Sequence, residues 1–421
     1  MKAENNHWSW SLIFQRKRSF STMRIGVHAK ACLEAMLFVA LLSHINADEA
    51  DPFSDIERSL SRPPPSSSVS SAQPLLQFLW RREIFAMGIG EIGDNNSSRD
   101  SFLRLSAGLE NIVSFSTPTR TWASANLQLR LVYREPPLDT ELDPMGRTAS
   151  RWEIETHNAY LDLIAPVGPP GRVNLRFGRA YLPFGLNVQT DTHATLLPLS
   201  NDRLFGTERD WQLTAYGQAS ESLDYWLGYL LGSGMDQELK GQSGLLMGRL
   251  ALSPTWLYEQ NWEGGFSTAF GERMDPHSGI EGPIRTWRTG VDARHRRGTP
   301  YGPLTATVEI GGGEDGHNTL LSFLGQMDWI STARRWGIGL QYRVMDREQW
   351  VSTMSMPHDD KEHASPQGGT DHGITAVLTR YFRNDPNNAT LHWLALAVEV
   401  PFNASDSPTV VRPALAYYRY W

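Results

Sequence analysis

Cysteine is almost missing from this chain of 421 residues, which has a single one, Cys32, near its beginning. Disulfides, thiolate metal sites and cysteine nucleophiles are therefore excluded for everything beyond residue 32. Long apolar runs are scarce as well: after residue 47 no stretch approaches about 18 uninterrupted apolar residues, so the sequence predicts no membrane-spanning helix. Any part that crosses a membrane would have to be a closed β-barrel, because only helices and closed barrels satisfy every backbone hydrogen bond inside a bilayer.

Lysine is the second scarce residue type, with only Lys240 and Lys361 after residue 47. Six of the 39 lysines and arginines and two of the 46 acidic residues lie within the first 47 positions, so the remainder has a formal charge of −11. Nucleic-acid binding requires a basic surface. The sequence therefore predicts no nucleic-acid partner.

The N-terminal part has the order of features found in exported proteins. A weakly basic stretch begins at Met23, an apolar run covers residues 35–42, and the small Ala47 precedes two acidic residues. We expect residues 1–47 to be a leader and signal peptide that starts at Met23, with a buried N-terminal helix as the alternative. The Pro- and Ser-rich residues 48–77 are expected to form a disordered periplasmic linker.

From residue 78 onward, apolar and polar residues alternate with period two in one segment after another. In residues 123–131, Ala and Leu occupy the odd positions, whereas Ser, Asn, Gln and Arg occupy the even ones. A strand places these two sets on opposite faces, and a helix does not. The sixteen predicted strands are 78–90, 102–116, 122–133, 152–164, 172–180, 210–219, 224–231, 244–252, 263–271, 286–295, 303–310, 320–330, 335–344, 372–382, 391–400 and 411–421.

The predicted connections alternate between a short set and a mostly longer one. The short set is 117–121, 165–171, 220–223, 253–262, 296–302, 331–334 and 383–390. The longer set is 91–101, 134–151, 181–209, 232–243, 272–285, 311–319, 345–371 and 401–410. Outer-membrane barrels have short periplasmic turns and longer outer loops, whereas a β-sandwich has no reason for this alternation.

The chain ends with the aromatic-rich run YYRYW at residues 417–421, an ending that resembles those of many outer-membrane barrels of Gram-negative bacteria. Aromatic rings are favoured at the lipid–water boundary, and we expect the rings of this closing strand to lie there, with Arg419 on the same face. We therefore predict an all-β fold over residues 78–421, a transmembrane antiparallel β-barrel of about 16 strands, located in the cell outer membrane.

Residues 177–186 read FGRAYLPFGL and are followed by TDTH at 190–193. This run resembles the strand-to-loop signature of the phosphate-selective porin family. The resemblance implies a porin for passive diffusion of small hydrophilic solutes or anions, surrounded by outer-membrane lipids, without a cofactor, and assembled as a homotrimer. In sixteen-stranded general porins the loop after strand five folds into the lumen, so the resemblance also implies a pore loop at 181–209. Its expected constriction residues are Asp191, His193, Asp202 and Arg203.

Polar faces of the predicted strands supply the candidate pore lining. These residues are Arg104, Asn126, Gln128, Arg130, Arg176, Arg288 and Arg343. Five arginines facing water would form a positive wall that attracts anions. The alternative is that they are ion-paired with Glu110, Asp162 or acidic residues of the loops.

We predict no catalytic and no metal site. GIGEIG at 88–93 spells a dinucleotide fingerprint, but the helix that this motif needs does not follow it. GGGEDG at 311–316 is interpreted as a turn, with calcium binding at its two acidic residues as the alternative. HDDKEH at 358–363 could bind a divalent cation, yet a solvated loop is the preferred interpretation because nothing fixes a ligand geometry.

Two other classes of protein stay open at this point. One is an outer-membrane barrel enzyme, which would need a nucleophile and a base on converging strands. The other is a secreted carbohydrate-binding β-sandwich, for which the 15 tryptophans would provide stacking surfaces. Tryptophans near predicted strand ends favour the barrel, and these are Trp122, Trp152, Trp211, Trp287, Trp336 and Trp421.

Overall fold

The fold is described from a computed structural model, whose described residues all belong to one compact unit, Ala47–Trp421. They are 76–90, 102–135, 152–186, 195–205, 208–232, 244–252, 261–273, 283–316, 318–347, 369–385, 390–403 and 411–421. The predicted leader and all but the last two residues of the predicted linker lie outside these ranges. Within them, no helix has the length and apolar character needed to cross a membrane.

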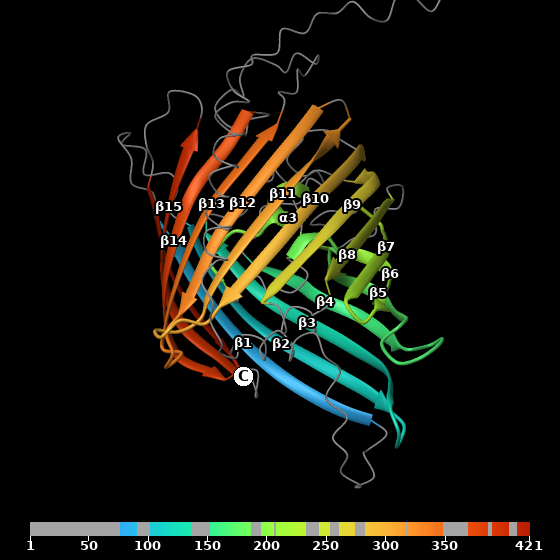
Figure 1. The fold of residues 1–421 in the computed structure, drawn as a ribbon. Helices are drawn as coiled ribbons and strands as arrows, with labels where there is room; N and C mark the ends of the chain where they lie inside the picture. The colour runs from blue at the N-terminus through green and yellow to red at the C-terminus, as the bar shows by residue number, and fades with distance from the viewer. Residues whose placement is uncertain are drawn as a thin grey trace, which may run out of the picture. The chain divides into compact units, whose positions relative to one another are not determined.

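Within the described residues, sixteen antiparallel strands form one closed barrel (Figure 1). The strands are β1 (Leu76–Ile89), β2 (Phe102–Ser116), β3 (Thr121–Glu135), β4 (Trp152–Ile164), β5 (Asn174–Tyr181), β6 (Arg209–Ser220), β7 (Leu223–Leu230), β8 (Leu245–Leu252), β9 (Trp262–Arg273), β10 (Ile284–Arg297), β11 (Leu304–Asp315), β12 (Asn318–Ile330), β13 (Trp336–Arg347), β14 (Gly369–Asp385), β15 (Thr390–Asn403) and β16 (Arg412–Tyr420). A short helix, α3 (Ser200–Phe205), lies between β5 and β6 in the sequence.

The barrel closes where β1 pairs with β16, in a register that runs from Glu83↔Tyr420 to Ile89↔Ala414. Beyond this ladder, Arg82 and Trp421 exchange two backbone hydrogen bonds of 2.9 and 3.0 Å. Every other strand pairs with its neighbours in sequence. The predicted sixteen-stranded barrel is therefore confirmed. The β-sandwich alternative is wrong, because the sheet closes on itself instead of packing on a second sheet.

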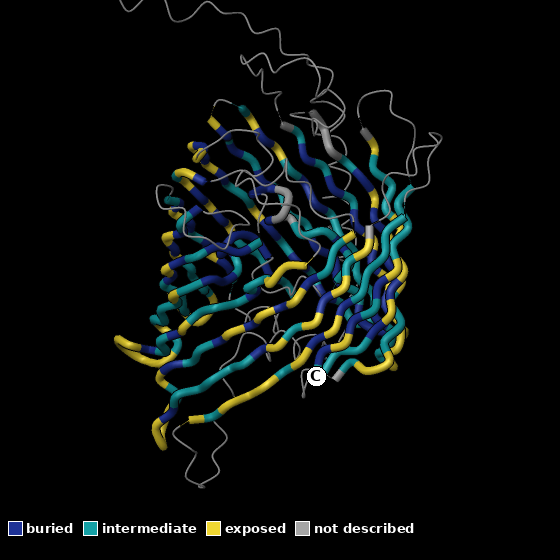
Figure 2. The backbone as a smooth tube through the Cα atoms, turned by 180° about the vertical axis from the view of Figure 1, so that it is seen from behind, coloured by how far each residue is buried: buried dark blue, intermediate teal, exposed yellow. Residues whose placement is uncertain are grey.

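Period-two alternation gives the wall two different faces, as the regular change between buried and exposed residues shows (Figure 2). In β2, Leu103, Leu105 and Leu109 are exposed on the outside, whereas Ser106 and Glu110 are buried on the inside. Leucine, phenylalanine and tryptophan dominate the exposed outer face of the other strands as well. An apolar outer face around a polar interior is the pattern of a barrel whose outside contacts lipid.

The segment GGGEDG at 311–316 is a strand over most of its length, which corrects its interpretation as a turn. β11 continues to Asp315, and Gly311–Gly313 pair with β10 and β12 on both sides. The connection to β12 is only two residues long, so this loop is an exception to the expected alternation. Three consecutive glycines suggested a break, but flanking strands that supply ladder partners on both sides keep glycine extended.

The C-terminal aromatic run is divided between the two faces, which corrects the expectation that all its rings lie at the lipid boundary. Tyr418 and Tyr420 are buried on the inner face, and Tyr417 and Trp421 belong to the outer one. A strand cannot turn consecutive side chains to the same side. Arg419 lies on the outer face as expected, with its guanidinium 4.5 Å from the centre of the Trp421 ring.

Candidate pore

The predicted pore-lining arginines lie on inward-facing positions of the wall, and each has a carboxylate partner. Arg104 Nη2 lies 2.8 Å from Glu155 Oε2. Arg176 donates to both carboxylate oxygens of Asp162, at 2.8 and 2.9 Å. The other three pairs are Arg130–Glu83, Arg288–Asp315 and Arg343–Glu399. These arginines are thus ion-paired, as the alternative to a bare positive wall expected, but Asp162 is the one partner it named, and the other four carboxylates belong to strands of the structure. A role of these arginines in conduction stays a prediction.

Arg176 is the most accessible of these arginines. Its side chain keeps 28% of its surface exposed, whereas its partner Asp162 keeps 9%. The guanidinium also lies over two tyrosine rings, 4.2 Å from the centre of Tyr160 and 5.2 Å from that of Tyr216. The aromatic faces and the carboxylate fix its position while one side still faces the interior.

Arg130 is fully enclosed, with no exposed surface, as is Arg288. It pairs with Glu83 of β1, with Nη2 donating to Oε2 at 2.7 Å, and it also contacts His157 of β4. His157 lies at a bulge, where the β3–β4 register shifts between Gln128 and Leu129. The bulge adds a residue to β4, which places an extra side chain on the inner face.

The two predicted amide residues also lie on the inner face. Asn126 donates to Glu110 at 2.7 Å, and Asn158 donates to Gln128 at 2.8 Å. Glu110 accepts a second hydrogen bond from the hydroxyl of Tyr420. This contact joins β2 to β16 across β1, so polar side chains reinforce the closure of the barrel.

Further inward ion pairs were missed by the sequence analysis. They include Arg134–Glu155, Arg249–Asp292, Arg294–Glu263 and Arg273–Asp315. Period-two counting could have found Arg249, because it alternates with the exposed Leu246 and Leu250 of β8. The partners could not be found in this way, since pairing across strands depends on register.

The described parts of the connection between β5 and β6, residues 182–186 and 195–205 (the inner segment), lie inside the barrel and contact the wall far from β5 and β6. The backbone N–H of Gly185 donates to Ser267 Oγ of β9, and that of Leu186 donates to Glu309 Oε1 of β11, both at 3.0 Å. Further along, Gln341 of β13 donates to the carbonyl oxygen of Pro198 at 2.9 Å. The wall thus supplies the partners that a loop buried in the interior needs for its backbone.

The helix α3 is held in the same way, beside β10 and β11 (Figure 1). Arg273 donates to the carbonyl oxygen of Phe205 at 2.8 Å, and Arg288 donates to that of Leu204 at 3.3 Å. The rings of Phe184 and Phe205 meet edge to face with their centres 5.1 Å apart. Both rings belong to a cluster of buried apolar residues that includes Met247, Leu320 and Met345 from the wall.

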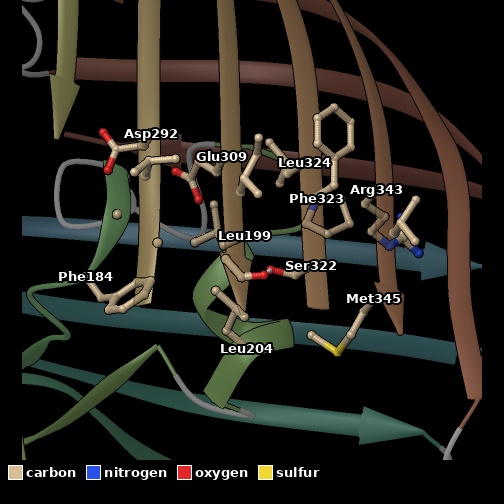
Figure 3. Close-up of a pocket in the computed structure, with 17 residues that line it drawn as sticks. Phe184, Leu199, Leu204, Asp292, Glu309, Ser322, Phe323, Leu324, Arg343 and Met345 are labelled. Atoms are coloured by element: carbon tan, nitrogen blue, oxygen red, sulfur yellow. Dashed lines mark hydrogen bonds between the residues drawn. The ribbon is translucent and has the colours of Figure 1, made fainter. Parts of the chain in front are cut away.

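Glycines of the wall make room for this inner segment at two positions. A Cβ atom at Gly339 of β13 would lie 2.9 Å from Leu197 Cδ1, and one at Gly290 of β10 would lie 3.2 Å from the Phe184 ring. Any larger residue would push the segment away from the wall, because packed interiors leave no such space. Figure 3 shows this contact zone, with Leu199 and Leu204 beside Ser322.

The four predicted constriction residues belong to this connection. Asp191 and His193 lie outside the described residues. Asp202 and Arg203 are in α3, and their side chains are likewise not described. The described parts of this connection contact the inner wall, and a pore loop over 181–209 with these four side chains at a constriction stays a prediction.

One part of the inner wall is apolar, which the sequence analysis did not foresee. Phe85, Trp393 and Tyr418 pack edge to face or tilted, with ring centres 5.6 to 6.5 Å apart. Leu197 of the inner segment and Val377 of β14 complete this cluster, together with alanines of β15 and β16. The inner face of β14–β16 and β1 is thus apolar at this cluster, whereas the inner face of the other strands carries ion pairs.

A cavity of about 230 Å³ lies between the inner segment and the wall from β10 to β15. Arg294, Arg296, Glu309 and Asp328 line one part of it, and Val377 and Trp393 line another. Leu196–Leu199 of the inner segment lie over it. Within the described ranges, no group of three or more His, Cys, Asp or Glu side chains could hold a metal ion.

Comparison with known proteins gives matches at the level of the fold. No family model and no curated protein matches the chain. The structure of OprB from Pseudomonas putida has a TM-score of 0.57 at 9% identity, covering 82% of this chain and 94% of OprB. The anion-selective porin from Comamonas acidovorans has a TM-score of 0.52 at 10% identity, covering 82% of this chain and all of that one.

A third neighbour, the outer membrane channel DcaP of Acinetobacter baumannii, has a TM-score of 0.51 at 8% identity and covers 82% of this chain and 97% of its own. These identities are too low to identify a solute, and a relation to phosphate-selective porins in particular is not shown. The strand number, the closed antiparallel topology and the neighbours agree with one another. The described chain has the fold of a sixteen-stranded outer-membrane porin barrel.

Proposed function

We propose that the protein is an outer-membrane channel through which small hydrophilic solutes diffuse passively. The observation that carries this proposal is the contrast between the two faces of the closed barrel, apolar outside and largely charged inside. Lipid favours the first face and water the second. The inner segment between β5 and β6 would narrow the path, as the resemblance to porins implies. No cofactor and no chemical step is needed for this function.

Planar-bilayer recording of the purified chain tests the proposal. We expect stepwise increases of current in KCl as single barrels insert. A complete lack of conductance under conditions where a known porin inserts would contradict an open channel. A purified protein that stays monodisperse in buffer without detergent would contradict the outer-membrane location itself, since an exposed apolar outer face requires lipid or detergent.

A weak anion preference is the finer form of this proposal. It is supported by Arg176, whose charge is more accessible than that of its carboxylate partner. A fixed positive charge on a narrow path raises the local anion concentration. The reversal potential in a KCl gradient measures this preference, and a value that indicates cation preference would remove it.

Assembly and targeting complete the proposal. The resemblance to porins implies a homotrimer, which native electrophoresis against subunits of known mass can test. Residues 1–47 would be removed on export, so N-terminal sequencing of the membrane-inserted protein should begin at Asp48. An intact leader on the inserted protein would contradict this expectation.

A further inference from the structure

Three arginines lie on the outer side of the wall, close together at one end of the barrel. They are Arg380 of β14, Arg419 of β16 and Arg82 of β1. The C-terminus marks this end (Figure 1), and the short connections 331–335 and 386–389 belong to it. Short connections face the periplasm in outer-membrane barrels, so these arginines lie at the periplasmic end.

Strand pairing places all three side chains on the outer face. Arg380 pairs directly with Trp336, whose side chain is exposed there. Arg419 pairs with Ile84, which is likewise exposed on the outer face. Arg82 precedes Ile84 by two residues on the same strand, so its side chain points the same way.

These arginines differ from those of the interior in having no carboxylate partner. Within the described residues, none of the three forms an ion pair. The guanidinium of Arg380 lies 4.8 Å from the centre of the Trp336 ring, and that of Arg419 lies 4.5 Å from the centre of the Trp421 ring. Aromatic rings hold a guanidinium in place but do not neutralise its charge. Three positive charges therefore stand beside a lipid-facing wall without a counter-ion from the described chain.

Their spacing fits the head of one lipid. Arg380 and Arg419 are separated by β15, whereas Arg419 and Arg82 are on the paired strands β16 and β1. From ideal strand spacings, the Cα atom of Arg419 lies roughly 8 Å from that of Arg82 and roughly 12 Å from that of Arg380. The long side chains of arginine cover such distances, so the three guanidinium groups can converge on one anionic group.

The wall next to these arginines is apolar on the side toward the middle of the membrane. Leu378, Leu396 and Leu415 pair with one another across β14, β15 and β16, and all three are exposed. An unpaired guanidinium beside hydrocarbon is unfavourable, so a negative group is needed near it. A molecule that fits both parts of this surface has an anionic head and apolar chains.

We propose that the outer face of β14, β15, β16 and β1 binds an anionic phospholipid of the periplasmic leaflet, of the phosphatidylglycerol class. Arg82, Arg380 and Arg419 hold its phosphate through charge-assisted hydrogen bonds, which guanidinium groups form well with phosphate oxygens. Its acyl chains lie along the row of leucines. The bound lipid adds to the proposed channel function a fixed depth of the barrel in the membrane.

Native mass spectrometry of the purified full chain in a neutral detergent tests the site. Phosphatidylglycerol and phosphatidylcholine with identical acyl chains are added in equal amounts, and the ratio of the two bound lipids is measured. We expect phosphatidylglycerol to be the main bound lipid. Each of Arg82→Gln, Arg380→Gln and Arg419→Gln should lower the ratio about fivefold, the contribution of one arginine near an anionic membrane surface. The triple variant should bind both lipids equally.

Arg120→Gln is the matched control. Arg120 is an exposed arginine at the same end of the barrel, in the turn between β2 and β3. Its replacement should leave the lipid ratio unchanged. An unchanged ratio in the triple variant, or an equal decrease in Arg120→Gln, would overturn the inference. A band that shifts on boiling in electrophoresis verifies that each variant has folded.

Two further measurements separate a lipid from other occupants of this surface. Glycerol 1-phosphate has the phosphate of the lipid head without acyl chains, and it should not displace phosphatidylglycerol at equal concentration. Displacement would mean that the arginines bind free phosphate. A triple variant that loses association between subunits while its lipid ratio stays unchanged would mean that they contact a second copy. Either result would overturn the inference.

The outcomes for the channel and for the lipid site are distinguishable. A barrel that binds phosphatidylglycerol selectively but conducts no KCl contradicts only the proposed channel. A barrel that conducts KCl and binds both lipids equally contradicts only the lipid site.

Discussion

At the residue scale, the interior is governed by pairing of charges. Arg130 and Glu83 are both almost completely enclosed, and Arg249 and Asp292 repeat this arrangement on the other side of the barrel. A charge buried without its partner is strongly unfavourable, because protein atoms replace the water that solvated it. Each such pair bridges two strands that have one strand between them, β1 and β3 in the first case and β8 and β10 in the second.

Replacing Arg130 by Met should be more harmful than replacing both members of its pair. The single variant leaves Glu83 buried without its main partner, for a loss of about 3–5 kcal/mol in the free energy of unfolding. The double variant Arg130→Met with Glu83→Gln should recover much of this loss. Urea unfolding in detergent, followed by tryptophan fluorescence, measures both. A double variant no more stable than the single one would contradict this account.

Arg176 offers a test of ion selectivity. Arg176→Glu replaces the most accessible of the predicted pore-lining arginines by a negative charge, so the reversal potential in a KCl gradient should shift toward cations. Arg172→Glu is the matched control, since Arg172 is in the turn before β5 and donates to the carbonyl oxygens of Gln218 and Ala219 at the end of β6. A reversal potential that changes equally in both variants would count against a role of Arg176 in the path.

At the element scale, the strands and the inner segment differ in how far sequence predicts them. Strand positions follow from local alternation, and all sixteen predicted strands exist, with β11 longer than expected. The contacts of the inner segment depend instead on residues distant in sequence, such as Leu197 over Gly339. The apolar wall of Phe85 and Trp393 escaped prediction for a related reason: alternation identifies two faces but not which of them accepts a buried aromatic ring.

The close contact at Gly339 predicts how the inner segment can be displaced. Gly339→Val puts a branched side chain where Leu197 lies, so the segment should move off the wall and single-channel conductance should rise. Overpacking of this kind should also lower stability by about 1–3 kcal/mol.

Gly325→Val is the control for this experiment, because Gly325 lies on the outer face of β12 with the Phe323 ring as its neighbour. It introduces the same side chain into the same sheet without touching the inner segment. A conductance that is unchanged in Gly339→Val, or raised equally in both variants, would show that the segment does not limit the current.

At the scale of the whole molecule, closure of the barrel depends on one strand pair, β1 with β16, which we call the seam. Removal of residues 412–421 deletes β16 and leaves β1 and β15 each with one unpaired edge. Exposed strand edges associate with other chains. On electrophoresis of unboiled samples, a folded barrel migrates as a compact band, and boiling shifts this band. The truncated protein should not give such a heat-sensitive band. Full-length protein treated identically is the control, and a heat-sensitive band from the truncated chain would contradict closure through β16.

The same seam sets the order of events in folding. Its partners, such as Glu83 and Tyr420, lie at opposite ends of the described chain. Contacts between residues so distant in sequence form late, because joining them requires closing a very long loop. Until the final strand arrives, every partly formed sheet keeps two bare edges. Residues 412–421 therefore determine when the barrel can close. The chain has to be protected from aggregation until these residues have been synthesised, exported and paired.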